Sequence, residues 1–294
     1  MIQVIGYLRF SYPGRSDAAK SRDLDQDALR AYLYDPLRMA QRFHFFENIC
    51  LPSLDAQFDQ DFTLLVLIGD DMPPKYRAQM EQALEGRPYA RLIADGNGVL
   101  NDAFNPVAEE IKDPNAKMVV HFRLDDDDAI ARHVIRDLKK MAQVCREPTL
   151  LSMSRGIMLL ELEGEVHFVE EIRPYIAIGW ALALPPDVVR NAYEASHLRV
   201  ANTMPSMVDP RKYSYIHTVH EGSDSKQGSA NRVRNLIERS PVQPGTNTYR
   251  KMMATLGREF PCFSEEYLKD VRGNLPETLD DIGSDDDTAI SKSA

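Results

Sequence analysis

The residues with the clearest capacity for chemistry are four consecutive aspartates, Asp125 to Asp128, in the segment VVHFRLDDDDAI. Their carboxylates repel one another, and burial disfavours the charged form further. If the side chains alternate as in a strand, Asp125 and Asp127 point to one side and Asp126 and Asp128 to the other. Two converging carboxylates suit a hard divalent cation, which keeps coordination positions for phosphate oxygens. The segment therefore predicts a cation site for a phosphate-bearing ligand.

An aspartate before a helix also serves as an N-cap, and this is the structural alternative for the segment. A cap needs only one or two carboxylates, whereas four follow the apolar run here. A second acidic end, Asp70 and Asp71, follows the apolar run LLVLIG. For that pair, an ordinary Gly-Asp turn is an equal alternative to a binding role.

Apolar runs typical of strands alternate with helical patterns over the first 145 residues. Strands are predicted at 2–10, 61–71, 89–95 and 116–124, and helices at 35–57 with a stop near Pro52, 72–87, 99–113 with an interruption at Pro106, and 128–145. Such alternation is typical of a parallel sheet covered by helices. The second half is mixed, with two or three strands over 149–171, strands at 175–186 and 212–221, and helices near 231–239 and 246–257. The predicted fold class is α/β, a mostly parallel sheet flanked by helices with a mixed C-terminal half.

The acidic segments occupy equivalent places in this predicted fold. Asp70 and Asp71 follow one predicted parallel strand, and the four aspartates follow another. In an open α/β sheet, ligands bind beyond the carboxyl ends of the strands. We therefore expect both segments at the ligand-binding edge of the sheet.

Several segments carry a resemblance to known enzymes. RLDDDDAI resembles the Asp-x-Asp motif of nucleotide-sugar glycosyltransferases with the Rossmann-like GT-A fold, and LPSLDAQFDQDFTLLVLIGDD resembles the opening of family 2 glycosyltransferases, where a helix ending in Ser-x-x-x-Gln precedes an acidic strand end. NGVLNDAFNPVAEEI resembles the helix before their metal strand. Together with RFHFFENICLPSL, the set is similar to a bacterial rhamnosyltransferase family from about Tyr7 to Ser225.

The resemblance implies a role for each acidic residue. Asp70 or Asp71 would contact the base or the ribose of the nucleotide. Asp125 would bridge ribose and metal, Asp126 would stand among the nucleotide-sugar contacts, and Asp127 would ligate a Mn or Mg ion that holds the diphosphate. The implied partners are a nucleotide-diphosphate sugar donor and a glycan or lipid-linked acceptor.

The resemblance extends to three basic residues. Arg9 matches an early Arg-Phe-Ser segment and would face the diphosphate, although a solvated arginine at a strand end is an equal alternative. YIHTVHEGSDS resembles a late His-x-x-x-x-Ser segment, which implies His220 as the third metal ligand and His217 as the second choice. Because these two histidines point to opposite faces of a strand, only one of them is expected to reach the metal.

An inverting transfer needs a general base beside the acceptor hydroxyl. The candidates are Glu170, Glu171, Asp187, Glu194, His197 and Asp209. The Glu-Asp base motif of family 2 is not visible, but NAYEASH resembles a family segment, so we expect His197 first and Asp209 second as the catalytic residue. Trp180, the single tryptophan, is either a sugar-stacking platform or, more in keeping with its apolar strand, a core residue.

Composition restricts the function classes and the compartment. The net charge is −10, and the tail 276–294, with six acidic residues and one lysine, carries half of the imbalance, which argues against a nucleic-acid surface. None of the three cysteines belongs to a C-x-x-C pair, which favours a reducing cytoplasm. No apolar run approaches the ~18 residues of a membrane span. Peripheral membrane contact is compatible with these features.

Three regions are predicted along the chain. Residues 1–145 form the nucleotide-sugar-binding half, 146–275 the acceptor-binding half with C-terminal helices, and 276–294 a disordered acidic tail. The sequence thus predicts a cytoplasmic, metal-dependent glycosyltransferase of polysaccharide biosynthesis. One alternative is a haloacid-dehalogenase-like Mg-dependent phosphatase, which the order of the acidic strands disfavours. A non-catalytic protein that binds a nucleotide or a sugar is the other alternative.

Overall fold

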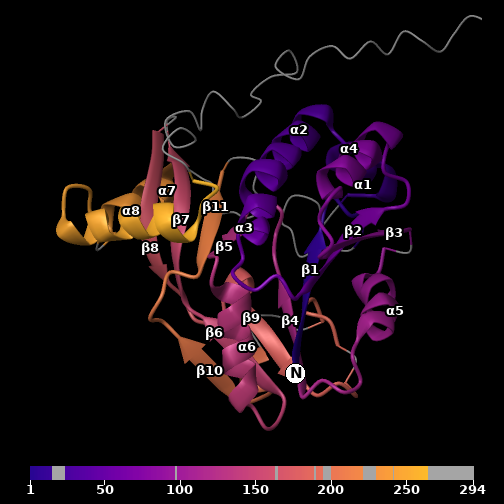
Figure 1. Ribbon diagram of the computed structural model, residues 1–294. Helices are drawn as coiled ribbons and strands as arrows, with labels where there is room; N and C mark the ends of the chain where they lie inside the picture. Colours follow the sequence, from indigo (N-terminus) through magenta and orange to yellow (C-terminus); the bar gives the residue numbers. More distant parts are fainter. Residues whose placement is uncertain are drawn as a thin grey trace, which may run out of the picture.

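The computed structural model describes residues 1–14, 24–96, 98–162, 165–188, 190–194, 200–220, 230–240 and 242–263. Its centre is a seven-stranded sheet in the order β10-β6-β9-β4-β1-β2-β3 (Figure 1). The strands are β1 (Ile2–Arg9), β2 (Thr63–Gly69), β3 (Ala90–Asp95), β4 (Met118–Arg123), β6 (Thr149–Met153), β9 (Trp180–Leu184) and β10 (Ser206–Asp209). Only β9 runs antiparallel to its neighbours. The predicted α/β fold class with a mostly parallel sheet is confirmed.

Helices cover both faces of this sheet. The larger core lies beneath α2 (Pro36–Phe45), α3 (Leu51–Asp55), α4 (Pro74–Leu84) and α6 (Val134–Val144), and a smaller core lies beneath α5 (Leu100–Ile111). Neighbouring residues of β1 alternate between the two cores: Val4 and Leu8 belong to the larger one, and Ile5 and Tyr7 to the smaller one. Burial on both faces explains why this strand is a continuous apolar run.

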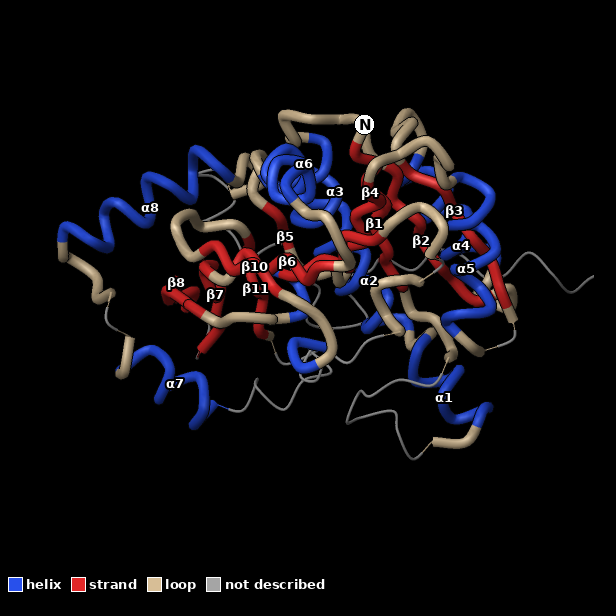
Figure 2. The backbone as a smooth tube through the Cα atoms, turned by 90° about the horizontal axis from the view of Figure 1, so that it is seen from below, coloured by secondary structure: helices blue, strands red, loops and turns tan. Residues whose placement is uncertain are grey.

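A four-stranded sheet in the order β5-β11-β7-β8 stands beside the main sheet. Its strands are β5 (Ala129–Ile130), β7 (Arg155–Leu162), β8 (Glu165–Ile172) and β11 (Tyr215–Val219). Figure 2 shows α7 (Ala230–Glu238) and α8 (Asn247–Glu259) at this end of the molecule. Because β5 follows Asp128 directly and pairs with β11, this sheet brings a late strand to the aspartates.

The chain differs from the sequence-based expectation in four places. The helix predicted at 35–57 does not stop near Pro52, because a π-helical turn, Phe46–Cys50, joins α2 to α3. Pro52 stands in the first turn of α3, where its missing N–H costs little. Pro106 lies inside an uninterrupted α5. The helix predicted from 128 starts only at Val134, after the short strand β5, and β10 was not expected.

The Ser-x-x-x-Gln pattern of the sequence, Ser53 and Gln57, fixes α3 to the chain that follows the aspartates. Ser53 Oγ accepts a hydrogen bond from the amide of Ile130 at 3.2 Å. Gln57 is buried, donates to the carbonyl of Ala131 at 3.0 Å, and accepts from the amide of Ile135 at 3.2 Å. Both side chains therefore substitute for backbone partners that β5 and the start of α6 lack, and they hold the aspartate segment in place.

We predict that Gln57→Leu lowers the free energy of unfolding by about 2–4 kcal/mol, because buried backbone groups lose their partners. Urea denaturation measures this loss. Gln82→Leu, at an exposed position of α4, is the matched control and should stay within about 0.5 kcal/mol of the unsubstituted protein. Equal stability of the two variants would show that Gln57 does not anchor this segment.

Candidate active site at the carboxyl edge of the sheet

The four aspartates form a turn beyond β4. The strand ends at Arg123, and the amide of Asp128 donates to the carbonyl of Asp125 at 3.2 Å. These residues therefore form a turn and not an extended strand, but the expected alternation is seen in their burial: Asp125 and Asp127 are partly exposed, and Asp126 and Asp128 are buried. Each carboxylate meets a partner from a different element of the fold.

Asp126 is fully buried and forms an ion pair with Arg42 of α2. Arg42 Nε donates to Asp126 Oδ2 at 2.7 Å, and Arg42 Nη2 contacts Oδ1. Burial raises the pKa of Asp126 to about 7, although the Arg42 guanidinium acts in the opposite direction. With both oxygens occupied by Arg42, Asp126 supports the turn from inside and is not turned toward a ligand.

Asp127 meets His220, which follows β11. Their Oδ2 and Nε2 atoms lie 3.2 Å apart, and the His220 ring lies 4.4 Å from the ring of Phe45, measured between centroids. Burial acts to raise the pKa of Asp127, but the hydrogen bond and charge of His220 outweigh it and lower the pKa. The Asp127 side chain keeps 20% of its surface exposed. An anionic carboxylate and an imidazole thus meet at the surface of the edge.

Asp128 and Asp125 complete the turn in different ways. Asp128 is buried and accepts a hydrogen bond from the amide of Thr218 in β11 at 2.9 Å. Burial raises its pKa well above the usual range, and the neighbouring carboxylates add to this effect. Asp125 is more exposed, at 37% of its side chain, and accepts from Arg123 Nη2 at 3.0 and 3.2 Å. Although burial opposes it, the charges of Arg123 and Arg9 lower the pKa of Asp125.

Arg9 and Arg123, at the ends of β1 and β4, converge on one aromatic ring. Their guanidinium carbons lie 5.6 and 4.6 Å from the ring centroid of Tyr193. Tyr193 in turn stacks on Phe104 of α5, with the ring planes 1° apart and the centroids 5.7 Å apart. Two cations therefore stand beside the single carboxylate of Asp125, which makes this part of the edge attractive to an anionic group.

Below that ring, Tyr7 and His121 form a buried pair on the α5 side of the sheet. The Tyr7 hydroxyl and His121 Nδ1 lie 2.7 Å apart. Burial lowers the pKa of His121 to about 3, and the charge of Lys112 acts in the same direction. His121 is thus neutral at physiological pH and belongs to the core that supports the site.

The second acidic end lies at the same edge, beyond β2. Asp71 binds Tyr34, whose hydroxyl donates to Oδ1 at 2.9 Å, and forms an ion pair with Arg30 of α1 (Gln26–Leu33). The Asp70 carboxylate lies against Gly96, where an added Cβ would come within 2.4 Å of Oδ2. Asp71 is thus bound by Tyr34 and Arg30. Asp70 directly follows β2 and lies against Gly96, which directly follows β3.

The remaining candidates lie apart from the aspartate turn or outside the described residues. Asp209 ends β10, the outermost strand, and binds Arg211 Nη2 at 2.7 Å, and this pairing lowers its pKa to about 2. His217 faces Glu171, not the aspartates, as strand alternation predicts. Trp180 is 1% exposed and belongs to the smaller core. His197, like the tail 276–294, lies outside the described residues.

Sequence reasoning missed three residues of the site: Arg42, Arg123 and Tyr193. Arg42 lies on a helix more than 80 positions before its partner Asp126, so no local pattern connects them. Arg123 directly precedes the aspartate segment, and its spacing of two from Asp125 was the one available signal. Tyr193 lies in the segment NAYEASH, whose resemblance pointed only to His197 as a general base.

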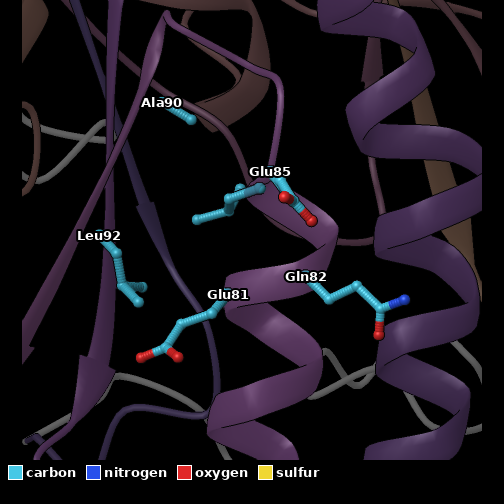
Figure 3. A pocket seen from close by; sticks show the side chains of 6 residues that line it. Glu81, Gln82, Glu85, Ala90 and Leu92 are labelled. Carbon is cyan, nitrogen blue, oxygen red and sulfur yellow. The ribbon is translucent and has the colours of Figure 1, made fainter.

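The described residues contain no group of three His, Cys, Asp or Glu side chains gathered as a ready-made metal site. Asp127 and His220 meet, whereas Asp125 is held by Arg123. The hollow between α4 and β3 in Figure 3, lined by Glu81, Gln82, Leu84, Glu85, Ala90 and Leu92, is a separate feature. Ala90 pairs with Leu64 near the start of β2, so this hollow lies at the amino ends of the strands.

Residues 3–232 match the model of a protein family described as "Putative rhamnosyl transferase". The chain belongs to this family. It is accordingly a glycosyltransferase, which sets aside the phosphatase alternative. None of the curated proteins matches the chain. Within the described segments, no helix has both the length and the apolar character needed to cross a bilayer.

Several solved structures are similar to this chain. For S. aureus TarS 1-349 the sequence identity is 13%, the match covers 95% of this chain and 76% of that chain, and the TM-score is 0.41. The complex of TarS 1-349 with UDP has 11% identity, coverage of 92% and 75%, and a TM-score of 0.35. A "putative nucleotide-diphospho-sugar transferase" from Desulfovibrio desulfuricans G20 has 9% identity, coverage of 87% and 97%, and a TM-score of 0.33.

We predict that Arg42→Met lowers the free energy of unfolding by about 3–5 kcal/mol at pH 8, because it leaves a buried carboxylate without its cation. The double variant Arg42→Met/Asp126→Leu should recover at least half of that loss, since no buried charge remains. Urea denaturation at pH 8 measures both. Equal losses in the single and double variants would show that the ion pair does not support the turn.

His121 provides a prediction about pH. Its folded pKa of about 3 lies below the unfolded value of ~6.5, so the unfolded state takes up the proton first and stability is lost as pH falls below ~6.5. Between pH 7 and pH 5 this contributes a loss of about 2 kcal/mol. His121→Gln should remove that part of the pH dependence, as measured by urea denaturation at both pH values. An unchanged pH dependence in the variant would mean that His121 is not held neutral.

Proposed function

We propose that this rhamnosyl transferase family member transfers a sugar, rhamnose or a related hexose, from a nucleotide-diphosphate donor to a hydroxyl of a glycan or lipid-linked acceptor. The transfer depends on a divalent cation, Mn or Mg. The single observation that supports this proposal best is the contact of Asp127 with His220 beyond the carboxyl end of β4. It joins two side chains 93 positions apart at the edge where α/β sheets bind ligands.

The donor set of this contact fits the proposed cation. Magnesium and related ions are usually bound through one or two carboxylates and substrate phosphates, with water in the remaining positions. Asp127 and His220 would hold the ion, with Asp125 as the third protein ligand expected from the sequence. When bound, the ion supplies charge neutralisation for the leaving diphosphate.

The rest of the edge supports binding of the donor nucleotide. Arg9 and Arg123 bring two cations to the end of β1 and β4, on the side where Tyr193 packs. A diphosphate bound beside Arg9 and Arg123 would neutralise their positive charges in place of the partly exposed carboxylate of Asp125. Asp70, at the ends of β2 and β3, would contact the base or the ribose, since Asp71 is bound by Tyr34 and Arg30.

We predict that Asp127→Asn abolishes the Mn²⁺-dependent part of nucleoside diphosphate binding and leaves the fold intact. Isothermal titration of UDP and dTDP, with and without MnCl₂, measures the binding, and thermal melting of the same samples checks the fold, because a ligand that binds the native state raises its stability. Asp102→Asn, on the exposed surface of α5, is the matched control and should bind as the unsubstituted protein does.

His220→Ala should weaken the affinity for Mn²⁺ by about 10–100-fold, a range taken from damaged support of metal ligands. His217→Ala should leave that affinity unaltered, because its ring faces Glu171. Direct titration with MnCl₂ separates the two variants. Retention of Mn²⁺ binding by both Asp127→Asn and His220→Ala would contradict the proposed metal site, and absence of any nucleoside diphosphate binding would contradict the proposed function itself.

A further inference from the structure

An inverting transfer requires a base for the acceptor hydroxyl, and the aspartate turn does not offer one. Asp126 and Asp128 are buried, Asp127 is paired with His220, and Asp125 is held by Arg123. Among the described residues, we therefore expect the base to be another carboxylate near the carboxyl edge. The described residues contain such a carboxylate in Glu171, near the end of β8.

Glu171 lies beside the carboxyl end of β6. That strand ends at Met153, Ser154 follows it directly, and the carbonyl of Ser154 accepts from the amide of Arg173 at 2.7 Å. Glu171 is the cross-strand partner of Gly156, near the start of β7. Because β6 and β4 both run antiparallel to β9, their carboxyl ends lie at the same edge of the main sheet.

Three groups surround the Glu171 carboxylate without holding it tightly. The Tyr215 hydroxyl and His217 Nδ1 each lie 3.4 Å from Oε2, and Arg173 Nη1 lies 3.8 Å from Oε1. The side chain is only 10% exposed. A carboxylate removed from water normally accepts short hydrogen bonds, so these long contacts leave acceptor capacity for a ligand hydroxyl.

One further polar atom at this place, Ser154 Oγ, is buried without a hydrogen-bond partner, on a residue that is 1% exposed. His217 Nδ1 is also buried, and its contact with Glu171 does not have the geometry of a hydrogen bond. The Ser154 carbonyl accepts from Tyr215 at 3.4 Å, which places Ser154 beside the tyrosine that contacts Glu171. A buried hydroxyl left unpaired is unfavourable, because it has lost its hydrogen bonds to water. A sugar hydroxyl can both donate and accept, so it would satisfy Glu171 together with Ser154 or His217.

Two glycines, Gly156 and Gly179, pack closely against the ring of Tyr215. An added Cβ at Gly156 would lie 2.1 Å from the Tyr215 ring, and one at Gly179 would lie 2.4 Å from the carbonyl of Met153 and 3.1 Å from the same ring. The backbone of β7 and of the chain before β9 thus approaches the ring closely. This packing fixes the tyrosine hydroxyl between Ser154 and Glu171.

The other carboxylates considered as the base are held or misplaced. Glu170 accepts from the Tyr213 hydroxyl at 2.6 Å and from Arg155 Nε at 2.8 Å. Glu194 accepts from the Asn105 amide at 2.8 Å. Asp209 is bound to Arg211 at the outermost strand, and Asp187 follows the end of the antiparallel β9, at the opposite edge of the sheet. Of the described candidates at the carboxyl edge, Glu171 is the one that lacks a short hydrogen bond.

We propose that Glu171 is the catalytic base for the acceptor, in an acceptor-hydroxyl site formed with Ser154, Tyr215 and His217. The proposal rests on the proposed glycosyl transfer and assigns its second substrate site. The acceptor O–H bond breaks and its proton passes to the Glu171 carboxylate. The acceptor oxygen forms a bond to the anomeric carbon of the donor, and the bond from that carbon to the diphosphate oxygen breaks, with its electron pair leaving on the diphosphate.

The test compares Glu171→Gln with Glu170→Gln, a neighbouring carboxylate on the opposite face of the same strand. Release of nucleoside diphosphate from UDP-rhamnose and dTDP-rhamnose is measured with MnCl₂, in water alone and with a panel of p-nitrophenyl glycosides as acceptors. Glu171→Gln should lower kcat by about 100-fold or more, the usual range for loss of a general base. Its dissociation constant for UDP or dTDP with MnCl₂, from isothermal titration, should stay within about threefold of the unsubstituted protein, since the variant removes no donor contact.

Glu170→Gln should keep kcat within about threefold and lower the melting temperature, because Arg155 and Tyr213 lose their partner. Glu171→Asp retains the carboxylate on a shorter side chain, so it should release more product than Glu171→Gln, even if the glutamine variant is less stable.

Full turnover by Glu171→Gln, or a loss of turnover in Asp209→Asn that Glu171→Gln does not show, would overturn the assignment. A loss of nucleotide affinity in Glu171→Gln equal to that of Asp127→Asn would also overturn it, by placing Glu171 in the donor site. If the unsubstituted protein binds neither nucleotide, the proposed function fails, and the assignment of Glu171 fails with it.

Discussion

Four carboxyl groups confined to one turn are the constraint on which the rest of this structure depends. Carboxylates that leave water must be paired, hydrogen-bonded or protonated, and no single neighbour can do this for all four. Arg42 comes from a helix in the first fifth of the chain and Arg123 from the strand before the turn. Thr218 belongs to β11 of the second sheet, and His220 directly follows that strand. The turn therefore exists only where α2, β4 and β11 meet.

This convergence also explains how the two halves of the chain are connected. The main sheet continues across residue 145, with β6, β9 and β10 added beside β4, so the expected nucleotide and acceptor halves share one sheet. The antiparallel β9 starts at the ligand-binding edge with Trp180 and runs away from it. In the chain, β7 of the second sheet follows closely after β6. Another strand of that sheet, β11, contacts Asp128 through the amide of Thr218. The regions 1–145 and 146–275, which the sequence divided, consequently share one sheet.

The fold was largely predictable from the sequence because burial on both faces leaves continuous apolar runs, as in β1, β2 and β4. The expectation that His220 and His217 separate to opposite faces followed from the period of a strand and agrees with their partners. The ion pair of Arg42 with Asp126 was not predictable, since it depends on the crossing of α2 over the edge. Likewise, nothing local distinguishes Glu171 from Glu170. Only the pairing with Gly156 and the packing of Tyr215 give the two carboxylates different surroundings.

The π-helical turn Phe46–Cys50 sets the rotational phase between two helices. In an α-helix each residue advances the side chains by about 100°, and a π-helical turn inserts one extra residue into that count. Arg42, before the turn, points to Asp126, and Ser53 and Gln57, after it, point to the chain that follows the aspartates. The extra residue of the π-helical turn changes the direction in which Ser53 points relative to Arg42. A one-residue deletion in the segment 46–50 would rotate α3 by about a quarter turn relative to α2 and would turn Ser53 away from the amide of Ile130.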